Sequence, residues 1–293
     1  MIFDNHRDCP ICGSKPHGSA FPYATYFNDF HFKYLKCGSC KSVFVSPVPD
    51  AKTFALMYAK AAYHDRYYEG GEVADFKESV CLLRHYLKSG SEILDYGCGM
   101  GGFLKACAAL DLVPFGVEFD LEAALFAKKN AKCEVMSVES FSNLASTLRF
   151  DGIHMGDVLE HLPDPSNTLS RLIDFLKPGG VLFVEGPIEL NPSPVYWAAK
   201  IFGTLKRVFN PTFVSNDPPT HLFLTNAQSQ RIFFTHVDKR LSICFWQVYE
   251  TGWPYRSGGL IKRSIALLAV LMGGRQFTGV TFGNRFKVIL RKT

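Results

Sequence analysis

The central part of the chain switches repeatedly between short apolar runs and longer amphipathic stretches. The apolar runs predict strands at residues 93–96, 113–118, 134–138, 150–155 and 181–185. The stretches between them predict helices that end near residue 110 or cover residues 121–130 and 165–176. Strands that alternate with helices are typical of βαβ units in a parallel sheet. The pattern therefore predicts an α/β fold that is doubly wound around a mostly parallel sheet.

The same pattern extends outside this central part. Apolar residues recur at helical spacing over residues 72–88, which predicts one amphipathic helix before the first strand. Residues 243–249 and 285–291 predict strands that complete the sheet. Between residues 188 and 220 the alternation breaks, and prolines flank an aromatic, basic middle. We interpret this segment as a lid-like insertion over the edge of the sheet, where inserted segments often determine specificity.

The first 50 residues differ in composition from the rest. They are rich in Cys, Gly, Pro and aromatic residues, and the sequence Ser-Pro-Val-Pro-Asp at 46–50 makes helix propagation difficult there. We therefore predict two domains. A small one covers residues 1–50, and a large one covers residues 51–293 and contains the insertion at about 188–220.

Composition and charge narrow the class of protein. Of the 293 residues, 47% are hydrophobic and 20% are charged, which is typical of a globular protein with a sizeable core. Lys and Arg number 32 against 27 for Asp and Glu, without long basic runs, so no nucleic-acid partner is expected. The longest apolar run, residues 265–272, is far shorter than the roughly 20 residues of a membrane-spanning helix. The first residues also lack the apolar segment of a secretory signal, so we expect a cytoplasmic protein.

Two cysteine pairs indicate a metal site. Cys9 and Cys12 form one Cys-x-x-Cys pair, and Cys37 and Cys40 form the second. Two such pairs can present four thiolates to one tetrahedral zinc ion, and a full set of protein ligands leaves no open position on the metal. We therefore predict a structural zinc in an N-terminal knuckle or ribbon. The alternative is four unrelated cysteines or a redox pair.

A glycine-rich turn follows the first predicted central strand. Gly97, Gly99 and Gly101 stand where a strand must turn sharply into a helix and where a ligand must approach the backbone. Glu118 ends the next strand, where a carboxylate can accept hydrogen bonds from both ribose hydroxyls. The turn is therefore interpreted as a nucleotide-binding loop, with a turn that binds nothing as the alternative.

Two ligands compete for this loop. Gly97, Gly99 and Gly102 also satisfy the Gly-x-Gly-x-x-Gly pattern of NAD-binding proteins. Asp95 favours S-adenosylmethionine (SAM), because a carboxylate there can hold the cationic amino group of methionine but would repel a pyrophosphate. An NAD-dependent oxidoreductase or sugar epimerase would need a Tyr-x-x-x-Lys pair, and Tyr196 with Lys200 has this spacing only inside the insertion. A non-enzymatic zinc-ribbon binding module is the third interpretation.

Three runs of sequence carry a resemblance to a known family. They are ILDYGCGMGGFL, VPFGVEFD and FDGIHMGDVLEHLPDPSNTLSRLIDFLKPGGVLFVEGP. With them the chain resembles the class I SAM-dependent methyltransferases, which have a Rossmann-like domain. Within this superfamily it looks most like the group with an N-terminal Cys-x-x-Cys…Cys-x-x-Cys knuckle, which includes sugar C-methyltransferases of antibiotic pathways. Those sugar enzymes usually carry a further C-terminal domain, which we do not expect here because the chain reaches only Thr293.

The resemblance implies a set of residues that bind SAM. By motif position these are the loop residues Asp95, Gly97, Gly99 and Gly101, the ribose ligand Glu118, the adenine neighbours Val138 and Glu139, and Met155 and Gly156 beside the methionine part. In relatives a tyrosine-rich segment, here Tyr63, Tyr67 and Tyr68, covers the donor. For Val138, Glu139, Met155 and Gly156 the alternative is core packing or loop filling, and for the tyrosines it is simple packing.

Methyl transfer from a sulfonium needs alignment of donor and acceptor and, for some acceptors, a base. His221 and His161 are the candidate bases, because a base should lie near the carboxyl ends of the strands. His221 follows the insertion. His221 stands in a Pro-Pro-Thr-His segment that resembles the substrate-side segment of many of these enzymes. His161, in Leu-Glu-His-Leu, has ordering of the donor pocket as its alternative role.

The insertion also bears on the substrate. Residues 195–209 predict an amphipathic helix with three cations, which is either a lid packed on the protein or a segment that lies on a membrane surface. We expect a methyltransferase whose acceptor is a sugar, a glycan or another small polar metabolite. The sequence does not determine whether the acceptor atom is oxygen, carbon or nitrogen, nor the oligomeric state.

Overall fold

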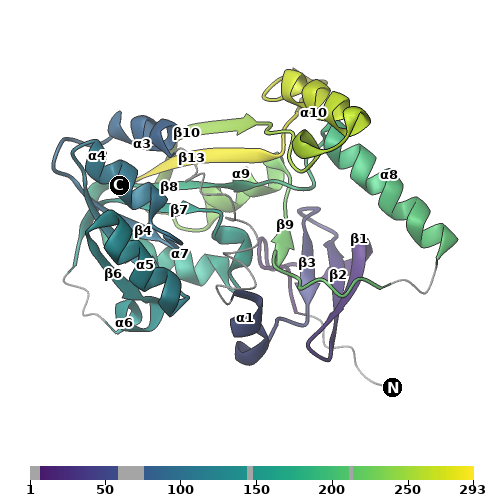
Figure 1. Cartoon of the computed structure of the whole chain (residues 1–293), viewed down its shortest axis with the longest axis horizontal. Helices are drawn as coiled ribbons and strands as arrows, with labels where there is room; N and C mark the ends of the chain where they lie inside the picture. Colours follow the sequence, from purple (N-terminus) through teal and green to yellow (C-terminus); the bar gives the residue numbers. More distant parts are fainter. Residues whose placement is uncertain (1–6, 59–75, 144–147, 211–213) are drawn as a thin grey trace.

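The computed structural model describes residues 7–58, 76–143, 148–210 and 214–293, and it has the predicted α/β architecture (Figure 1). Its centre is a seven-stranded sheet in the order β10-β13-β8-β7-β4-β5-β6. The strands are β4 (Glu92–Tyr96), β5 (Val113–Glu118), β6 (Glu134–Ser137), β7 (Phe150–Gly156), β8 (Leu176–Pro187), β10 (Leu241–Tyr249) and β13 (Arg285–Lys292). Strands β4 to β8 pair in parallel, whereas β13 is antiparallel to both of its neighbours.

The strand order reverses between β4 and β7. From β4 the chain moves outward through β5 to β6, and then returns to β7 on the other side of β4. At such a switch point the loops after the two strands diverge and leave a crevice at their carboxyl ends. The fold therefore prepares a ligand site above β4 and β7.

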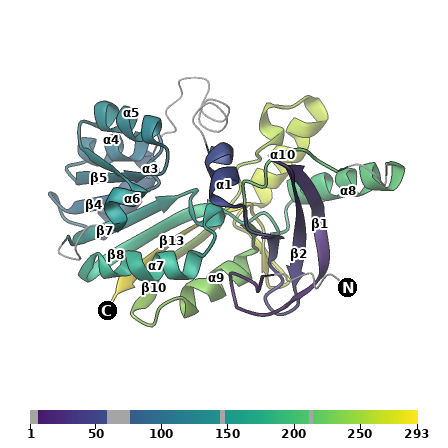
Figure 2. The ribbon, with the colours of Figure 1, turned by 90° about the horizontal axis from the view of Figure 1, so that it is seen from below.

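Helices cover both faces of the sheet (Figure 2). One face carries α3 (Lys77–Arg84), α4 (Gly102–Ala109) and α5 (Leu121–Ala131), and the other carries α6 (Val138–Ser142), α7 (Pro165–Asp174) and α9 (Ala227–His236). Successive strand residues point to opposite faces. In β8, Val181 and Phe183 pack in the cluster under α3 and α4, while Leu182 and Val184 pack in the cluster under α7 and α9. Burial on both faces explains why the strands read as continuous apolar runs.

The predicted strands and helices of the central part are confirmed, with differences at their ends. Val138 begins α6 instead of ending the third strand, because Ser137 caps that helix by accepting a hydrogen bond from the backbone N–H of Ser140. The predicted helix at 72–88 appears as α3, which ends at Arg84 and not at residue 88. Residues 72–75 lie outside the described residues.

A second, antiparallel sheet contains the N-terminal part. Its order is β1 (Pro16–Phe27), β2 (Phe30–Cys37), β3 (Val43–Ser46) and β9 (Phe223–Leu224). Helix α1 (Ala51–Tyr58) follows it. The fourth strand of this sheet thus comes from beyond the insertion. The division at residue 50 stays a prediction.

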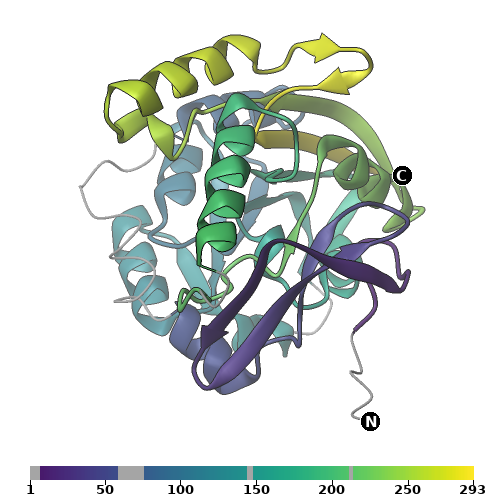
Figure 3. The same cartoon turned by 90° about the vertical axis from the view of Figure 1, so that its right-hand side faces the viewer.

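Two helices occupy the face of the molecule that is turned to the viewer in Figure 3. Helix α8 (Pro194–Phe209) confirms the helix predicted in the insertion, and it contacts α10 (Leu260–Met272) and β1. A short hairpin of β11 (Gln276–Phe277) and β12 (Val280–Thr281) follows α10. Among the described residues, none of the helices has the length and apolar character needed to cross a membrane.

A chain of buried charged side chains links the middle strands. His154 on β7 lies between Asp95 on β4, with 2.7 Å from Nδ1 to Oδ1, and Glu185 on β8, with 3.2 Å from Nε2 to Oε1. Its ring stacks on Phe103 at 3.6 Å between ring centroids. Although burial lowers it, the two carboxylates raise the pKa of His154 to about 9. The imidazole is therefore cationic at neutral pH and neutralises two buried carboxylates.

We expect His154→Ala to lower the free energy of unfolding by about 3 to 5 kcal/mol, because it leaves buried carboxylates without their cation. Since the folded-state pKa lies above the unfolded value, this contribution is complete below about pH 6.5. It is lost as the pH rises through about 9. Urea unfolding at several pH values measures both effects. His236 is exposed, so His236→Ala is the control. If the free energies of unfolding of the wild type and of His154→Ala changed in parallel with pH, the stabilising role of the His154 cation would be contradicted.

Candidate functional site

The loop between β4 and α4 has the conformation that only glycine accepts easily. Gly97 and Gly101 have φ values of 81° and 79°. A Cβ on Gly97 would lie 2.4 Å from Cγ2 of Val158, and a Cβ on Gly101 would lie 3.1 Å from the Cα of Ala127. The glycines are therefore required both for the backbone turn and for close packing.

Glu118, at the end of β5, is tied to this loop. Its Oε2 accepts a hydrogen bond from the backbone N–H of Gly99 at 2.8 Å, and its Oε1 accepts from Phe119 and Asp120 at 2.8 and 3.1 Å. These bonds hold the carboxylate at the carboxyl ends of the strands. There it can meet ribose hydroxyls, as the sequence predicts.

A cavity of about 400 Å³ lies beside this loop. Of the residues predicted to bind the cofactor, those that line it are Gly97, Gly99, Glu118, Val138 and Gly156. Its other walls include Phe54 and Tyr58 from α1 and Phe141, Leu172 and Phe175 from α6, α7 and the segment after it. A flat aromatic base and a ribose fit such an apolar slot with one carboxylate at its edge.

The other predicted cofactor residues do not line this cavity. Gly101 packs against Ala127, Met155 is fully buried in the core, and Glu139 is exposed at the start of α6. Asp95 is 2% exposed and is bonded to His154 through Oδ1. Its Oδ2 is buried and has no hydrogen-bond partner among the described residues, so it retains the capacity to accept from a cationic ligand. Tyr63, Tyr67 and Tyr68 lie outside the described residues.

A second cavity of about 580 Å³ adjoins the first. Asp157 and His161 line both cavities, whereas His221, Glu189 and Arg285 line only the second. The second cavity extends between Phe21 of β1, the first turns of α8, and the segment before α10. The two candidate bases thus lie at the junction of a nucleotide-sized cavity and a larger one.

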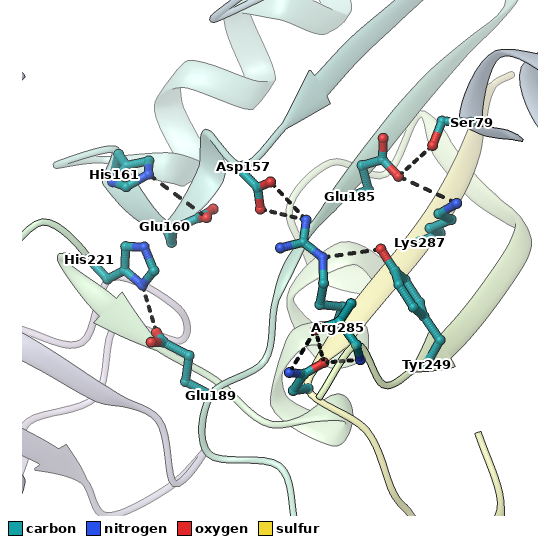
Figure 4. A network of polar contacts seen from close by, with 12 residues as sticks. Ser79, Asp157, Glu160, His161, Glu185, Glu189, His221, Tyr249, Arg285 and Lys287 are labelled. Carbon is teal, nitrogen blue, oxygen red and sulfur yellow. Dashed lines mark hydrogen bonds and ion pairs between the residues drawn. The ribbon is translucent and has the colours of Figure 1, made fainter. Parts of the chain in front are cut away.

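The two histidines lie side by side but in opposite electrostatic environments (Figure 4). Their ring centroids are 4.9 Å apart. His161 Nδ1 lies 2.7 Å from the carbonyl oxygen of Thr220, which can only accept, so Nδ1 carries the proton. Burial and the charge of His221 lower the pKa of His161 to about 3. His161 is therefore neutral at all ordinary pH values.

His221 is held by a carboxylate. Its Nδ1 lies 2.8 Å from Oε2 of Glu189, as Figure 4 shows. Although burial lowers it, the negative charge of Glu189 raises the pKa of His221 to about 9. The backbone N–H of Leu222 donates to the carbonyl of Glu160 at 2.8 Å, which fixes His221 beside the segment of His161. This pair has the geometry of an imidazole base oriented by a carboxylate.

Buried acids and an arginine complete the junction. Burial and the charge of Asp157 raise the pKa of Glu160 to about 8. Asp157 accepts from Arg285 at 2.7 and 2.8 Å, and Arg285 Nε lies 3.1 Å from the hydroxyl of Tyr249 (Figure 4). Ligand atoms of Glu160, His161 and His221 lie within 4.8 Å of one another, so these side chains are also close enough to share a cation.

Several residues of the site are absent from the sequence prediction. Tyr58 belongs to α1, which has no clear periodicity, and its hydroxyl lies 2.9 Å from His161 Nδ1 and 2.5 Å from the carbonyl of Thr220. Asp157 directly follows β7, and Glu189 comes shortly after the end of β8. Their position at the carboxyl ends of parallel strands is a signal that points to them.

The four N-terminal cysteines come together as predicted. Their sulfur atoms all lie within 4.8 Å of one another, with 3.6 Å between Cys9 and Cys40 and 3.5 Å between Cys12 and Cys37. A disulfide needs about 2.05 Å, so these are free thiols. Sulfurs around one zinc at about 2.3 Å are separated by about 3.8 Å, which is close to the observed spacing.

Comparison with known proteins decides between the interpretations of this site. A family model described as a methyltransferase domain matches residues 66–212, which is half of the chain. The chain belongs to this methyltransferase family. The match includes the glycine loop, Glu118 and the segment with His161, and it favours the methyltransferase interpretation over an oxidoreductase.

Curated relatives of the methyltransferase match only its central part. The ubiquinone biosynthesis O-methyltransferase of Xanthomonas oryzae pv. oryzae is 32% identical over 122 residues, which are 39% of this chain and 49% of that protein. The enzyme of the same description from Glaesserella parasuis is 30% identical over 106 residues, 33% of this chain and 45% of that protein. The chain thus spans about half the length of the curated relatives it matches.

Solved structures share the fold of the methyltransferase at low sequence identity. A SAM-dependent methyltransferase from Archaeoglobus fulgidus superposes with a TM-score of 0.50 at 18% identity and covers 78% of this chain and 98% of its own. Phosphoethanolamine N-methyltransferase 2 of Haemonchus contortus, in complex with SAM, superposes with a TM-score of 0.52 at 15% identity. The match covers 85% of this chain and 61% of that one. These likenesses confirm the predicted fold class.

We expect Gly97→Ala to weaken the binding of SAM to the methyltransferase by at least about tenfold, measured by calorimetry, because the new methyl group collides with Val158 and displaces the loop. Gly90→Ala is a matched control. Gly90 has a φ of 77°, but a Cβ there meets no atom within 4 Å. It shares the backbone strain, about 1 to 2 kcal/mol, without the collision. Equal loss of affinity in both variants would contradict the importance of close packing.

Proposed function

We propose that the protein transfers a methyl group from SAM to a hydroxyl group of a sugar, a glycan or another small polar molecule. The observation that carries the proposal is the pair of cavities that meet at Asp157 and His161. The donor occupies the cavity beside the glycine loop, and the acceptor occupies the larger one. An oxygen acceptor is favoured because the curated relatives are O-methyltransferases.

The donor site fits the chemistry of SAM. Glu118 is placed for the ribose hydroxyls, and the backbone of Gly97 and Gly99 lies open to the ligand. The buried Oδ2 of Asp95, which has no partner among the described residues, suits the ammonium group of the methionine part. SAM supplies an electrophilic methyl group on a cationic sulfur, so the protein has to align the two reactants and manage one proton.

We assign that proton to His221. A hydroxyl in the second cavity that hydrogen-bonds to its Nε2 can lose its proton as the oxygen attacks the methyl group, while Glu189 holds the opposite nitrogen and stabilises the imidazolium that forms. His161 has too low a pKa to be an efficient base at neutral pH, and its bonds to Thr220 and Tyr58 suit it to shaping the junction of the cavities.

We expect His221→Ala to retain SAM affinity and to lose roughly 10²- to 10⁴-fold in kcat, the usual contribution of a positioned base. Since only neutral imidazole accepts a proton, kcat of the wild type rises as the pH increases through about 9. Glu189→Gln should move this rise to lower pH, because it removes the charge that raises the pKa of His221. Transfer of radiolabelled methyl to candidate nucleotide sugars and glycans measures these profiles.

His161→Ala is the comparison for the base. It should weaken SAM binding and lower kcat together, since His161 lines both cavities. An active His221→Ala enzyme beside an inactive His161→Ala enzyme with normal SAM affinity would reverse the assignment.

We also propose that Cys9, Cys12, Cys37 and Cys40 hold one structural zinc ion. Their spacing suits a tetrahedral tetrathiolate, and Cys9 and Cys37 are buried at the base of the β1–β3 sheet. The zinc would join the chain before β1 to the turn between β2 and β3. It lies outside both cavities, whose linings contain none of the four cysteines.

Elemental analysis should find one zinc per chain, and Cys12→Ser should lose it together with part of the stability of the N-terminal sheet. Cys12 and Cys244 are both exposed thiols, so Cys244→Ser is the matched control and should keep its zinc. The proposal would be contradicted by a wild-type protein without zinc, or by a Cys12→Ser protein that still contains one zinc per chain.

A further inference from the structure

Helices α8 and α10 lie on the same face of the molecule (Figure 3). Both helices expose apolar side chains. Helix α8 exposes Trp197, Ile201, Phe202, Leu205, Val208 and Phe209, and helix α10 exposes Leu260, Ile261, Leu267, Leu268 and Leu271. We call these residues the α8–α10 face. Contiguous exposed patches of this kind mark surfaces that bind a protein or a membrane.

The amphipathic pattern of α10 is inverted with respect to an ordinary surface helix. Ala266 and Ala269 are its buried residues, and they face the protein. The opposite side should be polar, but it carries Leu260 at 84% exposure, Leu267 at 63% and Leu271 at 57%. Burial within this chain therefore does not explain why these leucines are present.

The segments that carry the α8–α10 face contain cations and no acidic residue. Residues 190–216 contain no Asp or Glu, and neither do residues 251–293. Lys200 flanks the apolar stripe of α8, with its Nζ 5.5 Å from the ring centroid of Trp197. Lys262 and Arg263 are exposed on α10. Apolar side chains flanked by cations, without anions, complement an anionic lipid surface.

The larger cavity reaches this face. Its lining includes Tyr196 and Ala199 of α8, and Trp253 and Pro254 in the segment that leads to α10. Trp253 is 64% exposed, so it stands at the surface as well as in the wall of the cavity. An indole with one side in protein and one side open is well suited to the boundary between water and acyl chains.

We propose that the α8–α10 face docks on an anionic lipid bilayer, and that the acceptor is a polar group carried on a lipid which enters the larger cavity between α8 and Trp253. The docking surface stands on its own observations, whereas the acceptor class rests on the proposed function. A second copy of the chain is a poor occupant, because self-association of this face would bring its cations together.

The test is sedimentation with vesicles of phosphatidylcholine, with and without phosphatidylglycerol, at low and high salt. The wild type should bind the anionic vesicles and lose affinity as salt increases. Leu267→Glu/Leu271→Glu should bind them at least about tenfold more weakly, because two apolar side chains are replaced by anions. Lys262→Gln/Arg263→Gln should lose the preference for phosphatidylglycerol.

Helix α5 offers a matched control. Leu121 and Leu125 are also exposed leucines one helical turn apart, at 65% and 71%, but on a helix far from α8 and α10 (Figure 1). Leu121→Glu/Leu125→Glu should bind vesicles like the wild type. All variants are first shown by circular dichroism and urea unfolding to be folded.

Three results would overturn the docking proposal. They are a wild type that binds neither kind of vesicle, equal binding by the α10 and α5 variants, or a wild-type dimer in the absence of lipid that Leu267→Glu/Leu271→Glu dissociates. Calorimetry with SAM separates this test from that of the proposed function. If the protein binds vesicles but not SAM, the proposed methyltransferase activity is refuted and the docking proposal stands. If it binds SAM but not vesicles, the docking proposal is refuted and the proposed activity stands.

Discussion

The buried chain from Asp95 through His154 to Glu185 is the interaction on which the site depends. It joins β4, β7 and β8, the strands on either side of the switch point, through a single imidazole that bridges two carboxylates. Ser79 on α3 and Lys287 on β13 add contacts to Glu185 at 2.9 and 3.8 Å (Figure 4). The loops that leave β4 and β7 line part of the first cavity, and the loops that leave β7 and β8 line part of the second.

The same charged side chains determine the protonation of His154. His154 stays cationic because two carboxylates compensate its burial. A few residues away, His161 is buried without such compensation and stays neutral. The pKa of His221 is raised to about 9, like that of His154, because Glu189 lies beside its ring. Imidazoles in one region thus have different pKa values because their surroundings differ.

The sequence was sufficient for the parts of the fold that local pattern determines. Parallel strands buried on both faces produce apolar runs such as residues 181–185, and glycines with positive φ reveal the loop at Gly97. The knuckle follows from cysteine spacing alone. What the pattern leaves out depends on contacts between distant segments. From the sequence, His154 is an ordinary strand residue, and its role depends on its contacts with Asp95 on β4 and Glu185 on β8. Tyr58 contacts His161 because α1 packs beside the cavity. The position of Asp95 in the motif predicts a cofactor role for it. The burial of its Oδ2 could not be predicted from the sequence.

The contribution of β9 to the N-terminal sheet constrains how the chain can be synthesised and folded. Residues 16–46 contain three of its strands, but the outer edge of β3, with Val43 and Phe44, pairs with Phe223 and Leu224. Such pairing between distant segments raises contact order and slows folding. During translation this edge stays open until the ribosome has passed residue 224, and an open apolar edge is a template for association with other chains. The nascent protein therefore passes through an interval in which one edge of its first sheet lacks the partner strand that it has in the folded chain.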